Sequence, residues 1–201
     1  MASTLPFSQA CENNRHPILD ELRPRLKTAL RLLEIGSGTG QHGSFFATRL
    51  PHLEWQMSDL PGNIPHLQLR QAQAGRANLP AVITLDVTQP THLGQFDAVF
   101  SANTLHIMPA SAISNFFECA AMHLPIDGQL FVYGPFMYQG LYTSESNREF
   151  DLWLQERNPR SGLREIDDIC HWARAATLQL QEDIPMPANN RLLVFVKHAG
   201  Y

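Results

Sequence analysis

Short apolar runs alternate with longer amphipathic segments along most of the chain. The apolar runs are rich in Val, Ile, Leu and Phe and cover residues 30–35, 52–60, 81–87, 96–107 and 128–136. The intervening segments place apolar side chains at helical spacing and cover residues 41–50, 64–75 and 110–124. Strands that are apolar on both faces and separated by helices are typical of a buried parallel sheet. The pattern therefore predicts an α/β fold with a doubly wound sheet.

The last part of the chain departs from this alternation. From Leu178 onward, two strand-like runs are joined by a turn that is rich in Pro and Asn. The turn is too short for a crossover helix, so the two strands should be antiparallel. We therefore expect a seven-stranded, mostly parallel sheet with an antiparallel C-terminal strand. A chain of 201 residues suits one domain, which we expect to cover residues 1–201.

Composition narrows the classes of partner. The formal net charge is −4 and the Arg residues are scattered among acids, so nucleic acid is not an expected partner. Residues 1–16 contain neither a basic nor an apolar stretch of a secretory signal, and no run is long enough to span a membrane. Three distant cysteines and nine scattered histidines predict neither a disulfide framework nor a metal site. We expect a cytoplasmic protein without a membrane partner.

Candidate ligand-binding residues are concentrated in the stretch "LRLLEIGSGTGQHG" at residues 30–43, where Gly36, Gly38 and Gly40 follow the first strand. In doubly wound sheets, ligands bind outside the carboxyl ends of the strands. Glycine permits positive φ and lets a ligand approach the main chain, whose amides can meet polar ligand atoms. A tight turn without a ligand is the alternative, but three alternating glycines favour a bound ligand.

Asp59 closes the next strand, nineteen residues after Gly40. A carboxylate accepts two hydrogen bonds from a vicinal diol, so this position indicates a nucleoside ligand. A dinucleotide fingerprint would require a third glycine where Gln41 stands. Asp59 therefore fits a nicotinamide cofactor as well as other nucleosides, whereas Gln41 argues against the nicotinamide cofactor.

Several segments resemble known families. "EIGSGTG" resembles the first motif of class I S-adenosylmethionine-dependent methyltransferases, and "FDAVFSANTLHIMP" resembles their fourth. "ENNRHPIL", "SANTLHIMP" and "SNREFDLWLQERNPRSGLREIDD" together resemble the methyltransferase-like family catalogued as domain of unknown function 938, over about residues 8–198. This resemblance implies the Rossmann-like methyltransferase fold, with an N-terminal cap segment at about 1–29, a core at 30–201 and an insertion at about 136–165 over the substrate side.

The resemblance also implies a set of residues that bind S-adenosylmethionine and its product S-adenosylhomocysteine. The acid and glycine turn would wrap the methionine part, Asp59 would bind the ribose, and the third strand's end would meet the adenine. The full set is Glu34, Gly36, Ser37, Gly38, Thr39, Gly40, Asp59, Leu60, Asp86, Val87, Ala102 and Asn103. No metal ligand is expected.

His106 follows the fourth strand and is the candidate general base for an acceptor that must lose a proton. A structural histidine beside Asn103 is the alternative. Candidate substrate-binding residues come from the N-terminal segment and the insertion: Asn14, Arg15, Tyr138, Tyr142, Asn147 and Arg148. The arginines of the insertion could instead form ion pairs with acids on the protein surface, without a role in substrate binding.

The most specific function that these features predict is methyl transfer from S-adenosylmethionine to a small-molecule acceptor by in-line displacement. Two alternatives remain open. A non-catalytic S-adenosylmethionine-binding regulatory protein would keep the glycines and Asp59, and a nicotinamide-dependent oxidoreductase would share the fold.

Overall fold

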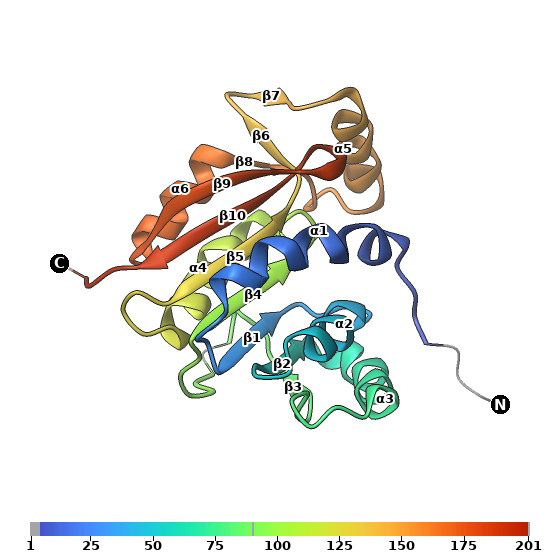
Figure 1. Ribbon diagram of the computed structural model, residues 1–201. Coiled ribbons are helices and arrows are strands. Elements are labelled where there is room, and N and C mark those ends of the chain that lie inside the picture. Colours follow the sequence, from blue (N-terminus) through green and yellow to red (C-terminus); the bar gives the residue numbers. More distant parts are fainter. Residues whose placement is uncertain (1–4, 90, 201) are drawn as a thin grey trace. The chain divides into compact units, whose positions relative to one another are not determined.

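A computed structural model describes residues 5–89 and 91–200, so residues 1–4 of the predicted cap and residue 201 lie outside the described part. The main sheet has seven strands in the order β3-β2-β1-β4-β5-β10-β9 (Figure 1). This order, with its antiparallel last pair, confirms the predicted fold class. The chain divides into two compact units, and each is described by itself. The first comprises the chain to Thr91 with Phe96–Phe100, and the second comprises His92–Gln95 and the chain from Ser101.

The first unit is built on parallel strands whose side chains are buried. Its elements are α1 (Gln9–Arg25), β1 (Arg31–Ile35), α2 (Gln41–Arg49), β2 (Glu54–Asp59), the 3-10 turn η1 (Pro61–Asn63), α3 (Ile64–Ala74), β3 (Ile83–Thr84) and the start of β4 (Ala98–Ala102). β1 pairs with β2 from Arg31 opposite Glu54, and it pairs with β4 on its other side. Leu32 and Trp55 are fully buried, as a sheet covered on both faces requires.

The helix α1 was not evident from the sequence. Ser8 caps it, because its hydroxyl accepts a hydrogen bond from the Cys11 amide. Pro17 and Pro24 lie within the helix, where proline usually interrupts helical hydrogen bonding. Ile18 and Leu22 are fully buried on one face of α1, so packing compensates for the two prolines.

Two predicted strands are shorter than their apolar runs. β3 ends at Thr84 instead of Asp86, because the Asp86 carboxylate turns the chain by accepting hydrogen bonds from the Thr88 amide and hydroxyl. β4 ends at Ala102 instead of near residue 107, because Asn103 adopts a φ of 57°, which no strand residue can have. The functional candidates Asp86 and His106 therefore lie in turns that follow the strands.

The second unit contains the antiparallel part of the main sheet. Its elements are the 3-10 turn η2 (Ala110–Ala112), α4 (Ile113–His123), β5 (Gln129–Gly134), α6 (Ile166–Ala175), β9 (Leu178–Met186), the turn η3 (Pro187–Asn189) and β10 (Asn190–Lys197). β10 is antiparallel to both β5 and β9, and β9 and β10 lie side by side in Figure 1. The prediction of an antiparallel final pair is thus confirmed.

The predicted insertion forms a small sheet of its own with one helix. β6 (Phe136–Tyr138) pairs with β7 (Leu141–Tyr142) and β8 (Arg164–Glu165), and α5 (Glu145–Arg157) lies between the latter two in the chain. Its place over a substrate stays a prediction. No helix among the described residues is long and apolar enough to cross a membrane.

Candidate functional site

The turn between β1 and α2 requires glycine for two different reasons. Gly36, Gly38 and Gly40 have φ values of 75°, 56° and 71°, which residues other than glycine adopt only at an energetic cost. A Cβ on Gly40 would lie 2.9 Å from Leu67 Cδ2, so this glycine allows α3 to pack closely. A Cβ on Gly38 would meet no heavy atom of the described chain within 4 Å. The main chain at Gly38 is therefore open to a ligand.

Asp59 connects the end of β2 to this glycine turn. Its Oδ2 accepts a hydrogen bond of 2.6 Å from the Gly38 amide, and its Oδ1 accepts from the Leu60 amide and Asn63 Nδ2. A carboxylate offers about four acceptor positions, so these bonds leave about one for a ligand hydroxyl. The sequence predicted that both residues lie at strand ends, and the structure adds the direct hydrogen bond between them.

Polar contacts hold the rest of the turn in place. The amides of Gly36 and Ser37 donate to the Ser58 carbonyl at 3.1 and 2.9 Å. Ser37 Oγ accepts from the Ser58 amide, and the Thr39 carbonyl accepts from Arg70 Nε at 3.0 Å. The backbone of the turn is thus fixed before any ligand binds, which lowers the entropic cost of binding.

Glu34 is fully buried below α2. Its Oε2 accepts a hydrogen bond of 2.8 Å from Trp55 Nε1, and a Cβ on Gly43 would lie 3.0 Å from the same oxygen. Burial raises the pKa of Glu34 to about 7, although the hydrogen bonds from Trp55 and Ser37 oppose the shift. Its packing against Trp55 and Gly43 places this side chain under the helix, and contact with a cofactor stays a prediction.

Asp86 and Val87 are half-buried in the turn after β3. Asp86 Oδ1 accepts two hydrogen bonds from Thr88. The other carboxylate oxygen has no hydrogen-bond partner among the described residues. Asp86 therefore retains an acceptor for the adenine amine that the resemblance implies.

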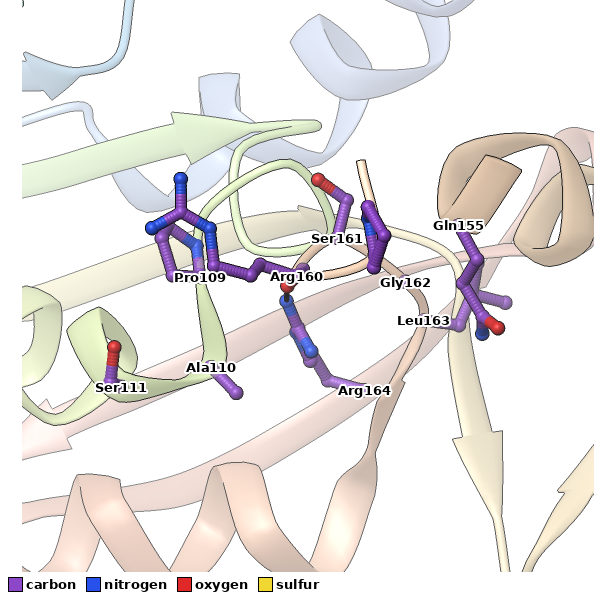
Figure 2. Close-up of a pocket in the computed structure, with 10 residues that line it drawn as sticks. Pro109, Ala110, Ser111, Gln155, Arg160, Ser161, Gly162, Leu163 and Arg164 are labelled. Atoms are coloured by element: carbon purple, nitrogen blue, oxygen red, sulfur yellow. Dashed lines mark hydrogen bonds between the residues drawn. The ribbon is translucent and has the colours of Figure 1, made fainter. Parts of the chain in front are cut away.

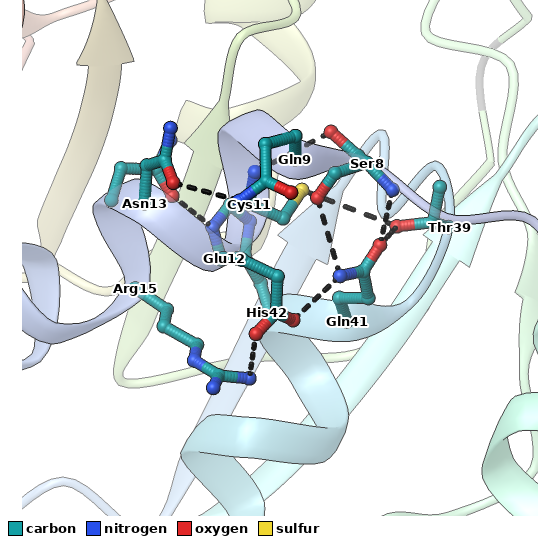
Figure 3. A network of polar contacts seen from close by, with 10 residues as sticks. Ser8, Gln9, Cys11, Glu12, Asn13, Arg15, Thr39, Gln41 and His42 are labelled. Carbon is teal, nitrogen blue, oxygen red and sulfur yellow. Dashed lines mark hydrogen bonds and ion pairs between the residues drawn. The ribbon is translucent and has the colours of Figure 1, made fainter.

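The N-terminal helix is joined to the glycine turn by a polar network that sequence reasoning missed (Figure 3). Gln41 Oε1 accepts from the Ser8 amide at 2.6 Å and from Thr39 Oγ1 at 3.0 Å. Its Nε2 donates to Glu12 Oε1 at 2.7 Å and to the Ser8 carbonyl. Gln41 stands where the dinucleotide fingerprint has a glycine, and that mismatch was the available signal. Here the side chain fastens the start of α1 to the turn.

Two predicted substrate residues of α1, Asn14 and Arg15, already have partners within the first unit. Asn14 is buried, and its Oδ1 lies 2.7 Å from His42 Nε2. Arg15 forms an ion pair of 2.7 Å with Glu12 and lies over the Phe45 ring. Burial, with a smaller effect of Arg15, lowers the pKa of His42 to about 4. These contacts serve the packing of α1, and a role in substrate binding stays a prediction.

In the second unit, the chain after β4 brings His106 and Asn103 together. The Asn103 amide donates to the Tyr133 carbonyl, and a Cβ on Gly134 would lie 3.7 Å from His106 Nδ1 and 3.9 Å from Asn103 Oδ1. His106 is buried, and its ring makes a T-shaped contact with the Phe150 ring. Burial, and then the charge of Arg164, lower the pKa of His106 to about 4. The imidazole is therefore neutral near pH 7 and only a weak base.

The loop that carries His106 is held by the segment before α6. The Gly162 amide donates to the His106 carbonyl at 2.9 Å, and Ser161 Oγ donates to the Ile107 carbonyl at 2.8 Å. Arg164 adds two bonds, from Nε to the Leu105 carbonyl and from Nη2 to the Met108 carbonyl. The position of His106 thus depends on residues more than fifty positions later in the chain.

The remaining predicted substrate residues lie on the insertion, each with its own partner. Tyr138 and Tyr142 each donate a hydrogen bond of 2.7 Å to a carboxylate, that of Asp183 and of Asp151 respectively. The other two are Asn147, which is buried and donates to Thr143 Oγ1 and the Asn189 carbonyl, and Arg148, which forms an exposed ion pair with Glu145. The structure does not gather these four side chains around one point.

Asp151 is a buried carboxylate that sequence reasoning missed. Its oxygens accept hydrogen bonds from Tyr142 Oη, from Gln155 Nε2 and, at 2.6 Å, from the Leu163 amide. A Cβ on Gly162 would lie 2.9 Å from Asp151 Oδ1. Asp151 thus fixes the segment that supports the His106 loop. An acid within the apolar stretch "FDLWL" was the signal in the sequence.

Comparison with known proteins supports the fold described above. A family model described as "Protein of unknown function (DUF938)" matches residues 5–197. An O-methyltransferase family protein from Burkholderia thailandensis is 18% identical with a TM-score of 0.79, and the match covers 96% of this chain and 58% of that one. A putative O-methyltransferase from Nostoc punctiforme is 16% identical with a TM-score of 0.80, covering 93% and 56%.

Human N-acetylserotonin methyltransferase, solved in complex with S-adenosylmethionine, is 12% identical with a TM-score of 0.78, and the match covers 95% of this chain and 53% of that one. The chain thus spans little more than half the length of these proteins. At identities this low, the comparison establishes the shared fold and nothing further.

Proposed function

Because the chain belongs to the DUF938 family and has the fold of S-adenosylmethionine-dependent methyltransferases, we propose that it transfers a methyl group from S-adenosylmethionine to a small-molecule acceptor. The observation that carries the proposal is the contact between Asp59 and the open main chain at Gly38. It supports the proposal because a carboxylate with a remaining acceptor position lies beside a surface that a ligand can approach, at the strand ends where doubly wound sheets bind ligands.

The residues of the first unit fit the proposed cofactor. The open face of Gly38 accommodates the methionine part, the remaining acceptor position of Asp59 suits a ribose hydroxyl, and the free oxygen of Asp86 suits the adenine amine. Leu60 and Val87 would flank the nucleoside, and Ser37, Thr39 and Gly40 would shape the turn. Ala102, the last residue of β4, and Asn103 after it belong to the second unit, and their contacts with the cofactor stay a prediction.

The bound cofactor would supply an electrophilic methyl group on a sulfonium sulfur. The protein then has to bind and orient the acceptor, an effect that can amount to about 7 to 11 kcal/mol in favourable cases. No covalent nucleophile is required. His106, neutral near pH 7, would accept a hydrogen bond from the acceptor or take its proton.

Thermal unfolding tests the choice of cofactor. A ligand at 100 times its dissociation constant stabilises the folded state by about 2.7 kcal/mol. S-adenosylhomocysteine should therefore raise the unfolding midpoint, whereas NAD should leave it unchanged. A rise with NAD alone would refute the proposal in favour of an oxidoreductase.

Turnover separates an enzyme from a binding protein. The protein is incubated with S-adenosylmethionine labelled in its methyl group and with a metabolite extract, and labelled products are separated by chromatography. We expect a labelled small molecule that is absent with Asp59→Ala. Binding of S-adenosylhomocysteine without any labelled product in broad extracts would indicate a regulatory protein.

A further inference from the structure

The second unit contains a polar pocket that is separate from the residues proposed to bind the cofactor (Figure 2). It has a volume of about 450 Å³ and is lined by Pro109, Ala110, Ser111, Gln155, Pro159, Arg160, Ser161, Gly162, Leu163 and Arg164. One wall is the turn η2 that leads into α4, and the other is the segment between α5 and α6. Two arginines and no acid line the pocket, so its walls carry a net positive charge.

Arg160 brings a charge that has no partner in the described part of the chain. Its side chain is exposed and extends toward Pro109 in Figure 2. Among the described residues, no carboxylate pairs with its guanidinium, and its backbone amide is the group that bonds to Asn158. An arginine that is used structurally normally has a carbonyl, a carboxylate or an aromatic ring beside it, as Arg157 has the Trp153 ring at 4.1 Å.

Arg164 brings a second, half-buried charge. Its Nε and Nη2 donate to the carbonyls of Leu105, Met108 and Arg160, which leaves Nη1 without a partner in the described chain. Carbonyl oxygens solvate a guanidinium but do not neutralise it. Burial accordingly lowers the pKa of Arg164, because the charge is not fully compensated. The acid that acts on this charge, Asp151, is committed to Tyr142, Gln155 and Leu163.

We propose that this pocket binds the anionic group of a small molecule, a carboxylate or a phosphate, between Arg160 and Arg164. The planar guanidinium of Arg160 can meet two oxygens of either anion with paired hydrogen bonds, and Arg164 can donate to the anion from Nη1. The negative charge would offset the positive charge of the pocket walls. The volume exceeds that of a phosphate ion, so the pocket also has room for part of the attached molecule. The proposal does not depend on methyl transfer.

The pocket is connected directly to the loop that carries His106. Arg164, Ser161 and Gly162 line the pocket and also donate to the carbonyls of that loop. An anion on Arg164 would reinforce the position of its guanidinium and hence these bonds. Amide exchange in residues 105–108 should therefore slow when the pocket is filled.

Titration with two simple anions tests the proposal on the whole chain. Sodium phosphate and sodium acetate are added separately at pH 7, with sodium chloride at equal ionic strength as reference, while the unfolding midpoint and the amide resonances are followed. We expect a saturable rise of the midpoint with at least one anion, together with shifts of the amide resonances of residues 160–164. A response to phosphate alone would assign a phosphate ligand, and a response to acetate alone a carboxylate.

Arg160→Ala should raise the apparent dissociation constant of the responding anion at least tenfold, and Arg160→Lys should raise it less. Arg157→Ala removes the same charge three residues away, outside the pocket lining, and should change the constant less than twofold. Because both side chains are exposed, both variants should fold. The proposal is overturned if neither anion gives a saturable effect, or if the two alanine variants weaken binding equally.

Discussion

The amide of Gly38 donates a hydrogen bond of 2.6 Å to the carboxylate of Asp59, so the residue that closes β2 orders the glycine turn after β1. The bond joins positions 21 residues apart, and it fixes the turn at Gly38, where the main chain is open. A ligand at Gly38 would therefore meet an aligned backbone and a carboxylate at the same time.

Asp59→Asn should weaken binding of S-adenosylhomocysteine about tenfold to a hundredfold, because hydrogen bonds to a charged group contribute about 1.5–3 kcal/mol. The amide also replaces one acceptor oxygen by a donor. Isothermal titration calorimetry measures the effect. Asn63→Ala is the matched control, since it removes a donor to the same carboxylate and keeps the charge. Equal affinities for Asp59→Asn and the unmodified protein would count against a ribose contact.

Alanine substitutions at two glycines should separate packing from ligand binding. Gly40→Ala should lower the free energy of unfolding by about 2–4 kcal/mol, because a positive φ and an overlap with Leu67 add up. Gly38→Ala should lower the free energy of unfolding by about 1–2 kcal/mol because of its positive φ alone. It should nevertheless weaken the binding of S-adenosylhomocysteine at least tenfold. Urea unfolding and calorimetry measure the two effects. The interpretation fails if Gly38→Ala binds normally.

Glu34 should make the protein less stable as the pH rises. Its pKa is raised from 4.5 to about 7 by burial, so the folded state holds the proton more tightly than the unfolded state does. This contribution is fully present below pH 4.5 and is lost as the pH rises through 7. The loss amounts to about 3 kcal/mol.

Glu34→Gln keeps an acceptor for Trp55 and cannot ionise. Relative to the unmodified protein, it should therefore gain stability steadily between pH 4.5 and pH 7.5. Urea unfolding at several pH values gives the difference between the two proteins, in which the effects of other titrating groups cancel. A difference in stability that does not vary with pH would rule out a raised pKa of Glu34.

His106 should remain neutral down to acidic pH. Its pKa is lowered from 6.5 to about 4 by burial and by Arg164, so the folded state binds the proton less tightly than the unfolded state. The corresponding stability is fully present above pH 6.5 and is lost as the pH falls toward 4. Nuclear magnetic resonance of the imidazole, assigned with His106→Gln, measures the titration. A midpoint near 6.5 would mean that the ring is accessible to water.

Gln41→Glu should loosen the start of α1. The new carboxylate would face Glu12 and the Ser8 carbonyl, where the amide now donates, and an unpaired buried group costs about 1–3 kcal/mol. Hydrogen exchange of residues 8–12 should accelerate, while Gln9→Ala, which alters an exposed contact with Asn13, should have little effect. Unchanged exchange in Gln41→Glu would show that the network does not hold the helix.

The sequence by itself determined several strands of the main sheet, the glycine turn and the antiparallel end of the sheet. Apolar periodicity predicted β1, β2 and β5, and the short turn before β10 excluded a crossover helix. Each of these signals lies in neighbouring residues, because periodicity, positive φ and loop length are local properties of the chain. The sequence also predicted Gly38 and Asp59 at the ends of neighbouring strands, whereas the hydrogen bond between them was found only in the structure.

Only the tertiary structure decided the partners of the polar side chains. α1 forms despite two prolines because its apolar face is buried, and Gln41 bonds to Ser8, which lies 33 residues earlier. Arg164 reaches Leu105 and Met108 across more than fifty residues. A polar side chain bonds to whichever segment the fold packs against it, so its partner depends on the packing of distant segments and not on the residues beside it.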